Sequence, residues 1–365
     1  MANLHLTFVI ESLGGGGAQR VLSLLATELC DLDQQVSVVT YADNGPDAVV
    51  LDPRVERLSA RLGGASRHAL SALLGNARRI AGLRSMVRRT QPDIVIAFVG
   101  TTNILTILAC IGLGVPVIIS ERNDPARQSL GRIWDVLRRM LYRKAALVTA
   151  NSTGAVVAMQ SYVPVAKLRH IPNLLPPHLD PWAPDAENPF VLAVGRLNRQ
   201  KGFDVLLDAF ALFAPRHKDW RLVILGEGPE REALTRRVDS LGLANRVRLE
   251  GFVDPAFYYQ RCRMFVLPSR FEGMPNALLE AMGHGCPTVA TAGTITGALD
   301  PVRGGTGTRA VPPEDPQALA EAMSELAADE ELACKFGTQA RRQVEALEPQ
   351  KIARAWLAIC EEVAH

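Results

Sequence analysis

Short apolar runs alternate with longer amphipathic stretches along most of the chain. The apolar runs predict buried strands at residues 4–10, 36–40, 93–98, 116–120, 146–150, 190–194, 221–225, 246–250, 264–267 and 307–311. Stretches between them carry apolar residues at three- and four-residue spacing, which predicts helices. Strands that alternate with helices predict an α/β protein whose parallel sheets are covered by helices on both faces.

A proline-rich segment interrupts this pattern near the middle of the chain. Its prolines are Pro172, Pro176, Pro177, Pro181, Pro184 and Pro189, a composition typical of a linker or hinge. A chain of 365 residues is also too long for one ordinary core and fits two domains. We therefore predict one α/β domain over residues 1–178, a linker over 179–189, a second α/β domain over 190–345 and a C-terminal helix over 346–365.

The overall composition is that of a soluble globular protein, with 48% hydrophobic and 21% charged residues. No apolar run reaches the ~20 residues of a transmembrane helix, and the N-terminus does not have the pattern of a signal peptide. These features predict a cytoplasmic protein. The six cysteines lack metal-binding spacing, so we expect reduced thiols, mostly in the core.

The net charge of +2 conceals an asymmetry between the two halves of the chain. Residues 1–180 hold 19 Lys and Arg against 13 Asp and Glu, a net charge of +6, and the remainder has a net charge of −4. The excess is concentrated in two groups: Arg67, Arg78, Arg79, Arg84, Arg88 and Arg89, and Arg132, Arg138, Arg139, Arg143 and Lys144. This distribution favours an anionic substrate or surface, such as a membrane, as a partner of the first half.

The stretch 271–290 has an order of residue types that packing alone does not explain. It follows the predicted strand 264–267, Pro275 suits the first turn of a helix, and residues 276–282 carry a helical pattern. The helix dipole and the free amides around this turn predict an anion site, formed by Gly273, Met274, Pro275, Asn276 and Ala277. Glu272 and Glu280 can flank the anion and bind hydroxyl groups. A sugar nucleotide therefore fits this segment better than a bare phosphate.

Two basic residues, Arg196 and Lys201, lie around the turn that follows the predicted strand 190–194. Both side chains can reach one diphosphate, where a double positive charge would stabilise a departing nucleoside diphosphate. Two ordinary surface basic residues are the alternative interpretation. We assign Asp204 to capping the helix that follows.

Four consecutive glycines, Gly14–Gly17, separate the first predicted strand from the next helix. Such a loop lets backbone pass close to a phosphate and leaves helix amides pointing at it. It lacks the spacing of a dinucleotide fingerprint, and no clear ribose-binding residue follows about twenty positions later, which disfavours a dehydrogenase. A simple tight turn is the alternative.

Ligands of parallel sheets bind beyond the carboxyl ends of the strands. The most polar such segment in the first half is 120–125, where Glu121, Arg122 and Asn123 are candidates for binding an acceptor. Arg122 would hold a diphosphate or a sugar hydroxyl. A loop capped by Asn123 or Asp124 is an equally good explanation.

The predicted helix 132–144 is amphipathic and basic. Its apolar residues are Ile133, Trp134, Leu137, Met140 and Leu141, and basic residues surround them. One interpretation is an interfacial anchor on an anionic membrane, in which Trp134 and Arg138 take part. The other is a helix packed on the core with a solvated basic face.

Three of these motifs, taken in order, resemble the landmarks of a known family. Glu272 and Glu280 are separated by seven residues, with a Gly after the first, and resemble the donor-binding signature of the family 4 retaining glycosyltransferases. Gly14–Gly17 and the pair Arg196 and Lys201 resemble two further landmarks. This likeness covers nearly the whole chain and implies the GT-B fold, in which two Rossmann-like domains face a central cleft.

The resemblance implies a role for each candidate residue. The catalytic residues would be Arg196 and Lys201, which hold the leaving diphosphate, and Glu272, which binds the donor sugar. Further donor contacts would come from Gly16, Gly17, Gly226, Phe252, Val253 and Glu280, and acceptor contacts from Gly15, Glu121, Arg122 and Asn123. No cofactor and no metal ion is implied, and a last helix, near residues 352–363, would cross back onto the first domain.

The predicted function is transfer of a hexose or N-acetylhexosamine from a UDP-sugar to an acceptor hydroxyl, with retention of configuration. The resemblance favours an acceptor saccharide on a polyprenyl diphosphate, in bacterial surface glycan synthesis, with the protein peripheral on the cytoplasmic side of the membrane. A soluble acceptor, a sugar-nucleotide epimerase or phosphorylase, and a non-catalytic nucleotide-sugar sensor are the alternatives. Nucleic acid is not an expected partner.

Overall fold

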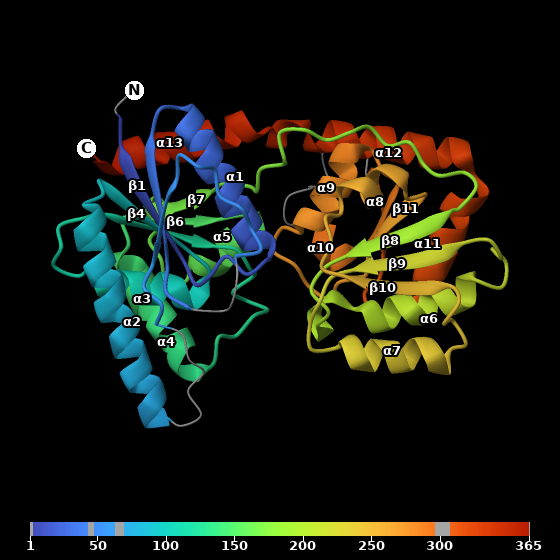
Figure 1. The fold of residues 1–365 in the computed structure, drawn as a ribbon, viewed down its shortest axis with the longest axis horizontal. Helices are drawn as coiled ribbons and strands as arrows, with labels where there is room; N and C mark the ends of the chain where they lie inside the picture. Colours follow the sequence, from blue (N-terminus) through green and yellow to red (C-terminus); the bar gives the residue numbers. More distant parts are fainter. Residues whose placement is uncertain (1–2, 43–46, 63–68, 296–306, 365) are drawn as a thin grey trace. The chain divides into compact units, whose positions relative to one another are not determined.

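The chain folds into two compact units, one made of residues 1–174 and 349–365 and the other of residues 175–348. The structure is a computed structural model that describes residues 3–42, 47–62, 69–295 and 307–364, with backbone only at 69–72 and 295 (Figure 1). Arg67, one of the predicted basic residues, lies outside the described residues. The predicted domain limits were 178 and 345, and the units divide after residues 174 and 348.

The first unit is built on a seven-stranded parallel sheet in the order β3-β2-β1-β4-β5-β6-β7. The strands are β1 His5–Ile10, β2 Gln35–Thr40, β3 Glu56–Ser59, β4 Ile94–Phe98, β5 Val117–Glu121, β6 Leu147–Ala150 and β7 Leu168–His170. Every residue of β4 and β5 is buried because helices cover both faces of the sheet.

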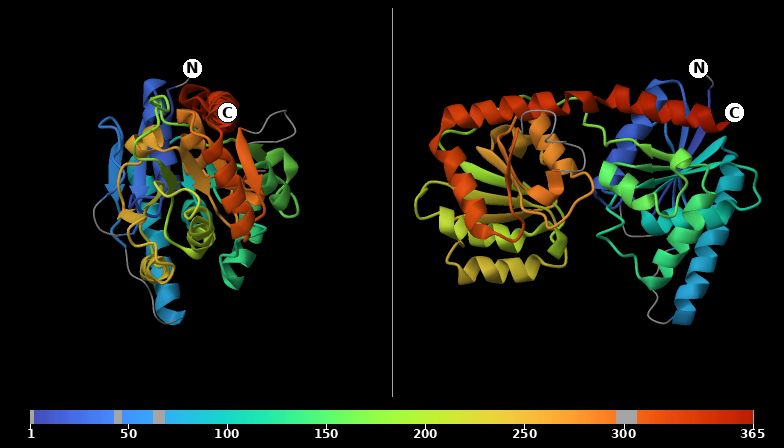
Figure 2. Two further views of the ribbon diagram at one scale, coloured as in Figure 1. Left: turned by 90° about the vertical axis from the view of Figure 1, so that its right-hand side faces the viewer. Right: turned by 180° about the vertical axis from the view of Figure 1, so that it is seen from behind.

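The helices of the first unit are α1 Gly17–Asp31, α2 Ala69–Thr90, α3 Gly100–Cys110, α4 Arg132–Leu141, α5 Thr153–Met159 and α13 Pro349–Ala364. The C-terminal helix α13 lies beside α1, as Figures 1 and 2 show from opposite sides. It also contacts β4, where the ring of Trp356 stacks on Phe98 at a centroid distance of 5.8 Å. This buried aromatic pair ties the end of the chain to the first sheet.

The second unit repeats the pattern with six parallel strands in the order β10-β9-β8-β11-β12-β13. The strands are β8 Phe190–Val194, β9 Arg221–Leu225, β10 Val247–Gly251, β11 Met264–Leu267, β12 Thr288–Thr291 and β13 Thr308–Val311. The helices are α6 Phe203–Phe213, α7 Arg231–Ser240, α8 Ala256–Arg261, α9 Asn276–His284, α10 Ala292–Ile295, α11 Pro316–Ala328 and α12 Glu330–Val344. Helices α6, α7 and α11 cover one face, and α8, α9 and α12 cover the other (Figure 1).

Both sheets reverse their strand order at one point, between β1 and β4 in the first unit and between β8 and β11 in the second. The loops that leave two such strands diverge to opposite faces and open a crevice at the carboxyl ends, where ligands of doubly wound folds bind. In the second unit, the loop after β8 carries Arg196 and Lys201, and the loop after β11 carries Glu272. Arg196, Lys201 and Glu272 therefore lie at the reversal point of their sheet.

All ten strands predicted from the apolar runs are confirmed, each to within one residue at either end. Three short strands, β3, β7 and β12, were not predicted. The predicted helix 132–144 is α4 followed by a single 3₁₀ turn, Tyr142–Lys144. No helix among the described residues has the length and apolarity needed to cross a bilayer.

The segment predicted as a linker is hydrogen-bonded along the second unit. Trp182 donates from its backbone amide to His284 and from its indole to the carbonyl of Cys262, at 2.8 and 2.6 Å. The amides of Ala183 and Asp185 donate to the carbonyls of Gln260 and Arg261, both at 2.9 Å. Residues 182–185 are thus fixed against α8 and the end of α9.

Candidate functional site

Lys201 and Glu272 meet at the carboxyl ends of β8 and β11. The Lys201 Nζ lies 2.7 Å from Glu272 Oε1, and both side chains are largely buried. The backbone joins the same two loops, because Arg270 donates from its amide to the carbonyl of Gln200 at 2.8 Å and Gln200 Nε2 donates to the carbonyl of Phe271 at 3.0 Å. The turn Arg199–Lys201 and the loop before α9 therefore form one rigid platform.

Arg270 holds this platform from its other side. Its guanidinium binds both carboxylate oxygens of Asp204 at 3.0 and 2.8 Å and also pairs with Glu314. Asp204 is not the N-cap of α6, as predicted, because that position is Gly202; Asp204 lies in the first turn of the helix and its carboxylate binds Arg270. These partners hold the pKa of Arg270 above its usual value, so its charge is permanent.

Glycines allow the loops of this platform to approach closely. Gly202 has φ +65°, and a Cβ there would lie 2.2 Å from the carbonyl oxygen of Pro268, at the end of β11. Gly226 has φ +139°, and its Cβ would lie 1.9 Å from the carbonyl oxygen of Gly195. Neither position can accept a side chain without moving the backbone that carries Arg196 or Lys201. The predicted contact of Gly226 with the donor stays a prediction.

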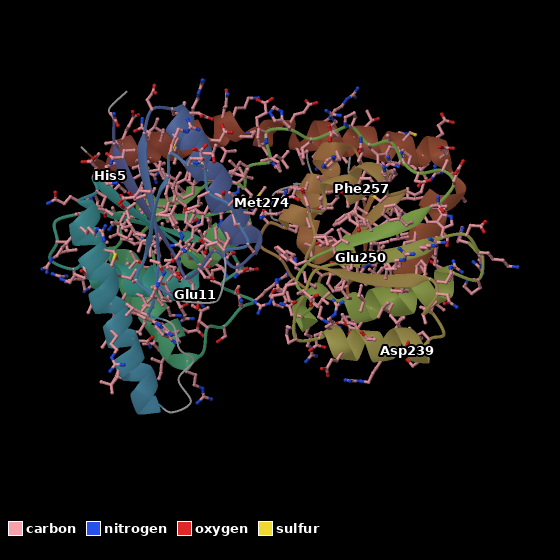
Figure 3. The ribbon with its side chains drawn as sticks, in the orientation of Figure 1. His5, Glu11, Asp239, Glu250, Phe257 and Met274 are labelled. Atoms are coloured by element: carbon pink, nitrogen blue, oxygen red, sulfur yellow. The ribbon has the colours of Figure 1, made fainter. Side chains whose placement is uncertain are left out.

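Helix α9 begins beside this ion pair. Pro275 is its N-cap rather than a residue of its first turn, and Asn276 and Ala277 open the helix. Gly273 and Met274 are buried in the preceding loop, where Figure 3 labels Met274. The first amides of a helix have no acceptor within it, so this end presents donors and a positive dipole to the platform.

Glu280 lies one turn inside α9 and is 6% exposed, so it is much more enclosed than the usual surface glutamate. Arg196, by contrast, is exposed on the turn after β8. Phe252 and Val253, directly after β10, are exposed apolar residues at 63% and 40%. The structure thus brings Lys201 to Glu272 in the loop before α9. Arg196 follows β8, whereas Phe252 and Val253 follow β10, and β9 lies between these two strands.

The predicted acceptor residues of the first unit belong to a buried polar network. Glu121 is 2% exposed and accepts hydrogen bonds from the Tyr142 hydroxyl at 2.9 Å and the Arg122 amide at 3.1 Å. Asn103 Nδ2 donates to the same Tyr142 oxygen at 3.1 Å. Burial raises the pKa of Glu121, and these hydrogen bonds and the Arg138 charge oppose that rise. The Glu121 carboxylate is enclosed by protein and positions its neighbours.

Arg122 stacks its guanidinium on the ring of Phe98, 4.8 Å from the centroid, and Nη1 lies 3.4 Å from Ser120 Oγ. Its Nη2 is buried and has no hydrogen-bond acceptor within the described part of the chain. Burial lowers the pKa of Arg122, and the Glu121 charge opposes this. Asn123 is half-buried in the following loop. An unpaired charged donor at a strand's carboxyl end is an anion-binding feature.

The glycine loop lies after β1, at the reversal point of the first sheet. Gly15 has φ +72°, Gly16 is the N-cap of α1, and Gly17 begins that helix. A Cβ at Gly16 would lie 2.6 Å from Gln19 Oε1, the end of a flexible side chain. The loop therefore presents a helix amino end at the position that the sequence predicts.

The sequence did not reveal the partners of these residues. Tyr142 and Arg270 had no assigned role, although each fixes a predicted site residue or its loop. They are 21 and 66 residues from Glu121 and Asp204, so no local spacing indicates them. Among the described residues, no three His, Cys, Asp or Glu side chains are grouped to hold a metal ion.

Two protein-family models together match most of the chain. The model described as "Glycosyl transferase 4-like domain" matches residues 16–174, and that described as "Glycosyl transferases group 1" matches residues 188–329. The chain belongs to glycosyltransferase family 4. The two matched regions of this glycosyltransferase follow the order of the predicted motifs. Gly16 and Gly17 lie in the first region, and Arg196, Lys201 and Glu272 lie in the second.

Individual proteins resemble this glycosyltransferase over nearly their whole length. A Campylobacter jejuni protein named "GalNAc-alpha-(1->4)-GalNAc-alpha-(1->3)-diNAcBac-PP-undecaprenol alpha-1,4-N-acetyl-D-galactosaminyltransferase" is 27% identical over 363 residues, 99% of each chain. Sucrose-phosphate synthase from Thermosynechococcus elongatus superposes with a TM-score of 0.83 at 20% identity, over 99% of each chain. Anabaena HepE in complex with UDP and glucose gives 0.80 at 22% identity, over 98% of this chain and 99% of that one. The fold of this glycosyltransferase is accordingly GT-B.

Proposed function

We propose that this enzyme transfers a hexose or N-acetylhexosamine from a UDP-sugar to a saccharide carried on a polyprenyl diphosphate, with retention of anomeric configuration. The Lys201–Glu272 pair beside the start of α9 carries the proposal, because it joins a cation for phosphate to an acid for sugar hydroxyls. The name of the Campylobacter relative, an undecaprenyl-diphosphate-dependent transferase, supports the acceptor class. The HepE complex, which contains UDP and glucose, supports the donor class.

On the donor side, Lys201 and Arg196 bind the diphosphate together with the amides at the start of α9. Glu272 binds hydroxyls of the transferred sugar, and the enclosed Glu280 binds those of the ribose. The exposed apolar pair Phe252 and Val253 offers a surface for the base. Positive charge at the diphosphate comes from the protein in this scheme, and neither a metal ion nor a cofactor is assigned a role.

On the acceptor side, Arg122 binds a phosphate oxygen of the lipid diphosphate through its unpaired Nη2. Glu121 holds the Arg122 backbone, and Tyr142 holds Glu121. Asn123, together with Gly15, binds the saccharide. A lipid-linked acceptor requires that the enzyme work at the cytoplasmic membrane surface.

The proposed reaction uses no protein base. The bond between the anomeric carbon and the UDP oxygen breaks, and the acceptor hydroxyl forms its bond on the same face of the sugar. The acceptor proton passes to the departing diphosphate oxygen. Lys201 and Arg196 stabilise the negative charge that develops on that oxygen.

A donor screen followed by a transfer assay tests the proposal. One UDP-sugar should raise the thermal transition of the protein above that given by other nucleotide sugars, because a ligand specific for the folded state stabilises it. That donor should then release UDP only with a polyprenyl-diphosphate saccharide, and the product should keep the anomeric configuration by NMR. Arg122→Gln should raise KM for the acceptor and leave the donor-induced shift unchanged.

Two results would contradict the proposal. Donor binding without UDP release from any acceptor would identify a nucleotide-sugar sensor. Equal transfer to free saccharides and to their lipid-linked forms would identify an enzyme with a soluble acceptor.

A further inference from the structure

The outward face of α4 carries three large apolar side chains. Ile133 is 77% exposed, Val136 56% and Met140 58%, whereas a helix packed on a core normally buries such residues. Their spacing of three and four residues puts them on one side of the helix. The green helix α4 is visible at the lower end of the first unit in Figures 1 and 2.

Four basic residues share this side of the helix and its following turn. Arg132, Arg139, Arg143 and Lys144 are all exposed. At 3.6 residues per turn, the five of these residues that belong to α4 span roughly 120° of its circumference, and Arg143 and Lys144 follow in the 3₁₀ turn. We call this set of seven residues the outer face of α4. It contains no acidic residue.

The helix is fixed so that this face points outward. Trp134 and Leu137 pack against the hydrophobic core of the first unit. Arg138 is 7% exposed and pairs with Asp135 at 2.8 Å, and Asp135 also accepts from the Leu130 amide at 3.1 Å. The expectation that Trp134 and Arg138 form a membrane anchor is therefore wrong, because both belong to the inward half of the helix.

We infer that the outer face of α4 docks on an anionic lipid surface. Aliphatic side chains can enter the headgroup region while the adjacent guanidinium and ammonium groups bind lipid phosphates, which is the arrangement of interfacial helices. This inference rests on the proposed function, since a lipid-linked acceptor lies in such a surface. It names the residues by which the enzyme reaches that surface.

A protein partner fits this face less well. Stable protein interfaces commonly need about 800 Å² from each side, and three side chains on one short helix supply only a part of that area. In a symmetric contact with a second copy, the four basic residues would oppose one another. An anionic bilayer needs no minimum contact area of this kind, and its continuous negative charge attracts the four basic residues.

Co-sedimentation of the full chain with lipid vesicles tests the inference without any substrate. Vesicles that contain phosphatidylglycerol should bind the protein, and pure phosphatidylcholine vesicles should not. The triple variant R132Q/R139Q/R143Q should lower the partition coefficient roughly a hundredfold at low ionic strength, at about fivefold for each charge. The variant I133S/V136S/M140S should lose the binding that persists at high salt.

Two matched variants serve as controls. I111S/V157S/V165S removes three exposed aliphatic side chains of the same unit, which are 51%, 63% and 65% exposed. R216Q/K218Q/R221Q removes three exposed basic residues of the second unit. Both controls should bind vesicles as the parent protein does.

The outcomes separate this inference from the proposed function. Undiminished vesicle binding by both α4 variants would overturn the inference, and so would a shift from dimer to monomer in sedimentation velocity without loss of lipid binding. Transfer to a short-chain, water-soluble diphosphate acceptor should survive in both α4 variants. Failure of that transfer in the parent protein would count against the proposed function and leave the vesicle result standing.

Discussion

Lys201 Nζ lies 2.7 Å from Glu272 Oε1, although 71 residues separate them in the chain. The pair brings a cation and an acid to the reversal point of the second sheet, where the loops after β8 and β11 diverge. Each charge is neutralised by the other. In the proposed function, a diphosphate takes Lys201 as its partner and a sugar hydroxyl takes Glu272.

Replacing either member of the pair should reduce kcat by at least a factor of 100, since removal of one positioned charge or donor at a transition state has effects of about this size. We expect this for Lys201→Ala and for Glu272→Ala in a UDP-release assay. The double variant should be little worse than either single variant, because groups that act as a unit are not additive. Lys218→Ala, at an exposed position of the same unit, is the control. Near-parental turnover of either single variant would remove that residue from the catalytic assignment.

Two glycines of the second unit offer a matched test of close packing. Gly202 and Gly242 have φ of +65° and +68°, but only at Gly202 would a Cβ meet another atom, the Pro268 carbonyl oxygen at 2.2 Å. Gly242→Ala should cost about 1–2 kcal/mol of stability from backbone strain alone. Gly202→Ala should cost more and should also weaken donor binding, because the adjacent Lys201 must shift. Equal thermal transitions and equal donor-induced shifts for the two variants would contradict this.

Thiol labelling tests the burial of the cysteines. Cys334 is exposed, whereas Cys110, Cys262, Cys286 and Cys360 are buried. Burial raises the pKa of Cys110 to about 11 and that of Cys360 to about 12, and it also raises the pKa of Cys286. Since the thiolate is the reactive form, native protein should be alkylated first at Cys334. Mass spectrometry should find the buried four protected until denaturant is added, and early labelling of Cys286 would show that this region opens.

Most of the predicted strands are largely apolar because they are buried on both faces of a sheet, as β4, β5 and β11 are. The missed strands β3, β7 and β12 are only three or four residues long and contain charged residues or threonines, as in Glu56–Ser59 and Leu168–His170. These strands are defined by their pairing with neighbouring strands, and no local sequence pattern encodes that pairing.

Only those parts of the candidate site that lie within one segment of the sequence could be predicted. Glu272 and Glu280 share one loop and helix, so their spacing indicates a common role. The pairing of Lys201 with Glu272 and of Tyr142 with Glu121 depends on which strands are adjacent, and only the folded sheet shows that. The same limit explains Arg138, whose helical position is basic in the sequence but faces Asp135 and the core.

Tyr142 should control the pH dependence of stability through Glu121. Burial raises the folded-state pKa of Glu121 above its usual 4.5, so the folded protein favours the protonated carboxyl group. The stability that this preference gives is complete below pH 4.5 and is lost as the pH rises through the folded-state pKa. The Tyr142 hydroxyl donates to Glu121 at 2.9 Å and opposes that shift. Tyr142→Phe should therefore destabilise the protein by about 1.5–3 kcal/mol where the carboxylate is ionised, and by less below 4.5.

Tyr162→Phe is the matched control for this prediction. Its ring lies 6.4 Å from that of Tyr142, and its buried hydroxyl has no hydrogen-bond partner within the described residues. Urea unfolding of the two variants across the acid range should show a loss that grows with pH only for Tyr142→Phe. Removing an unpartnered hydroxyl should change stability little at any pH, since no hydrogen bond is broken. A pH-independent loss in Tyr142→Phe would mean that Glu121 stays protonated throughout and that its charge has no part in holding Arg122.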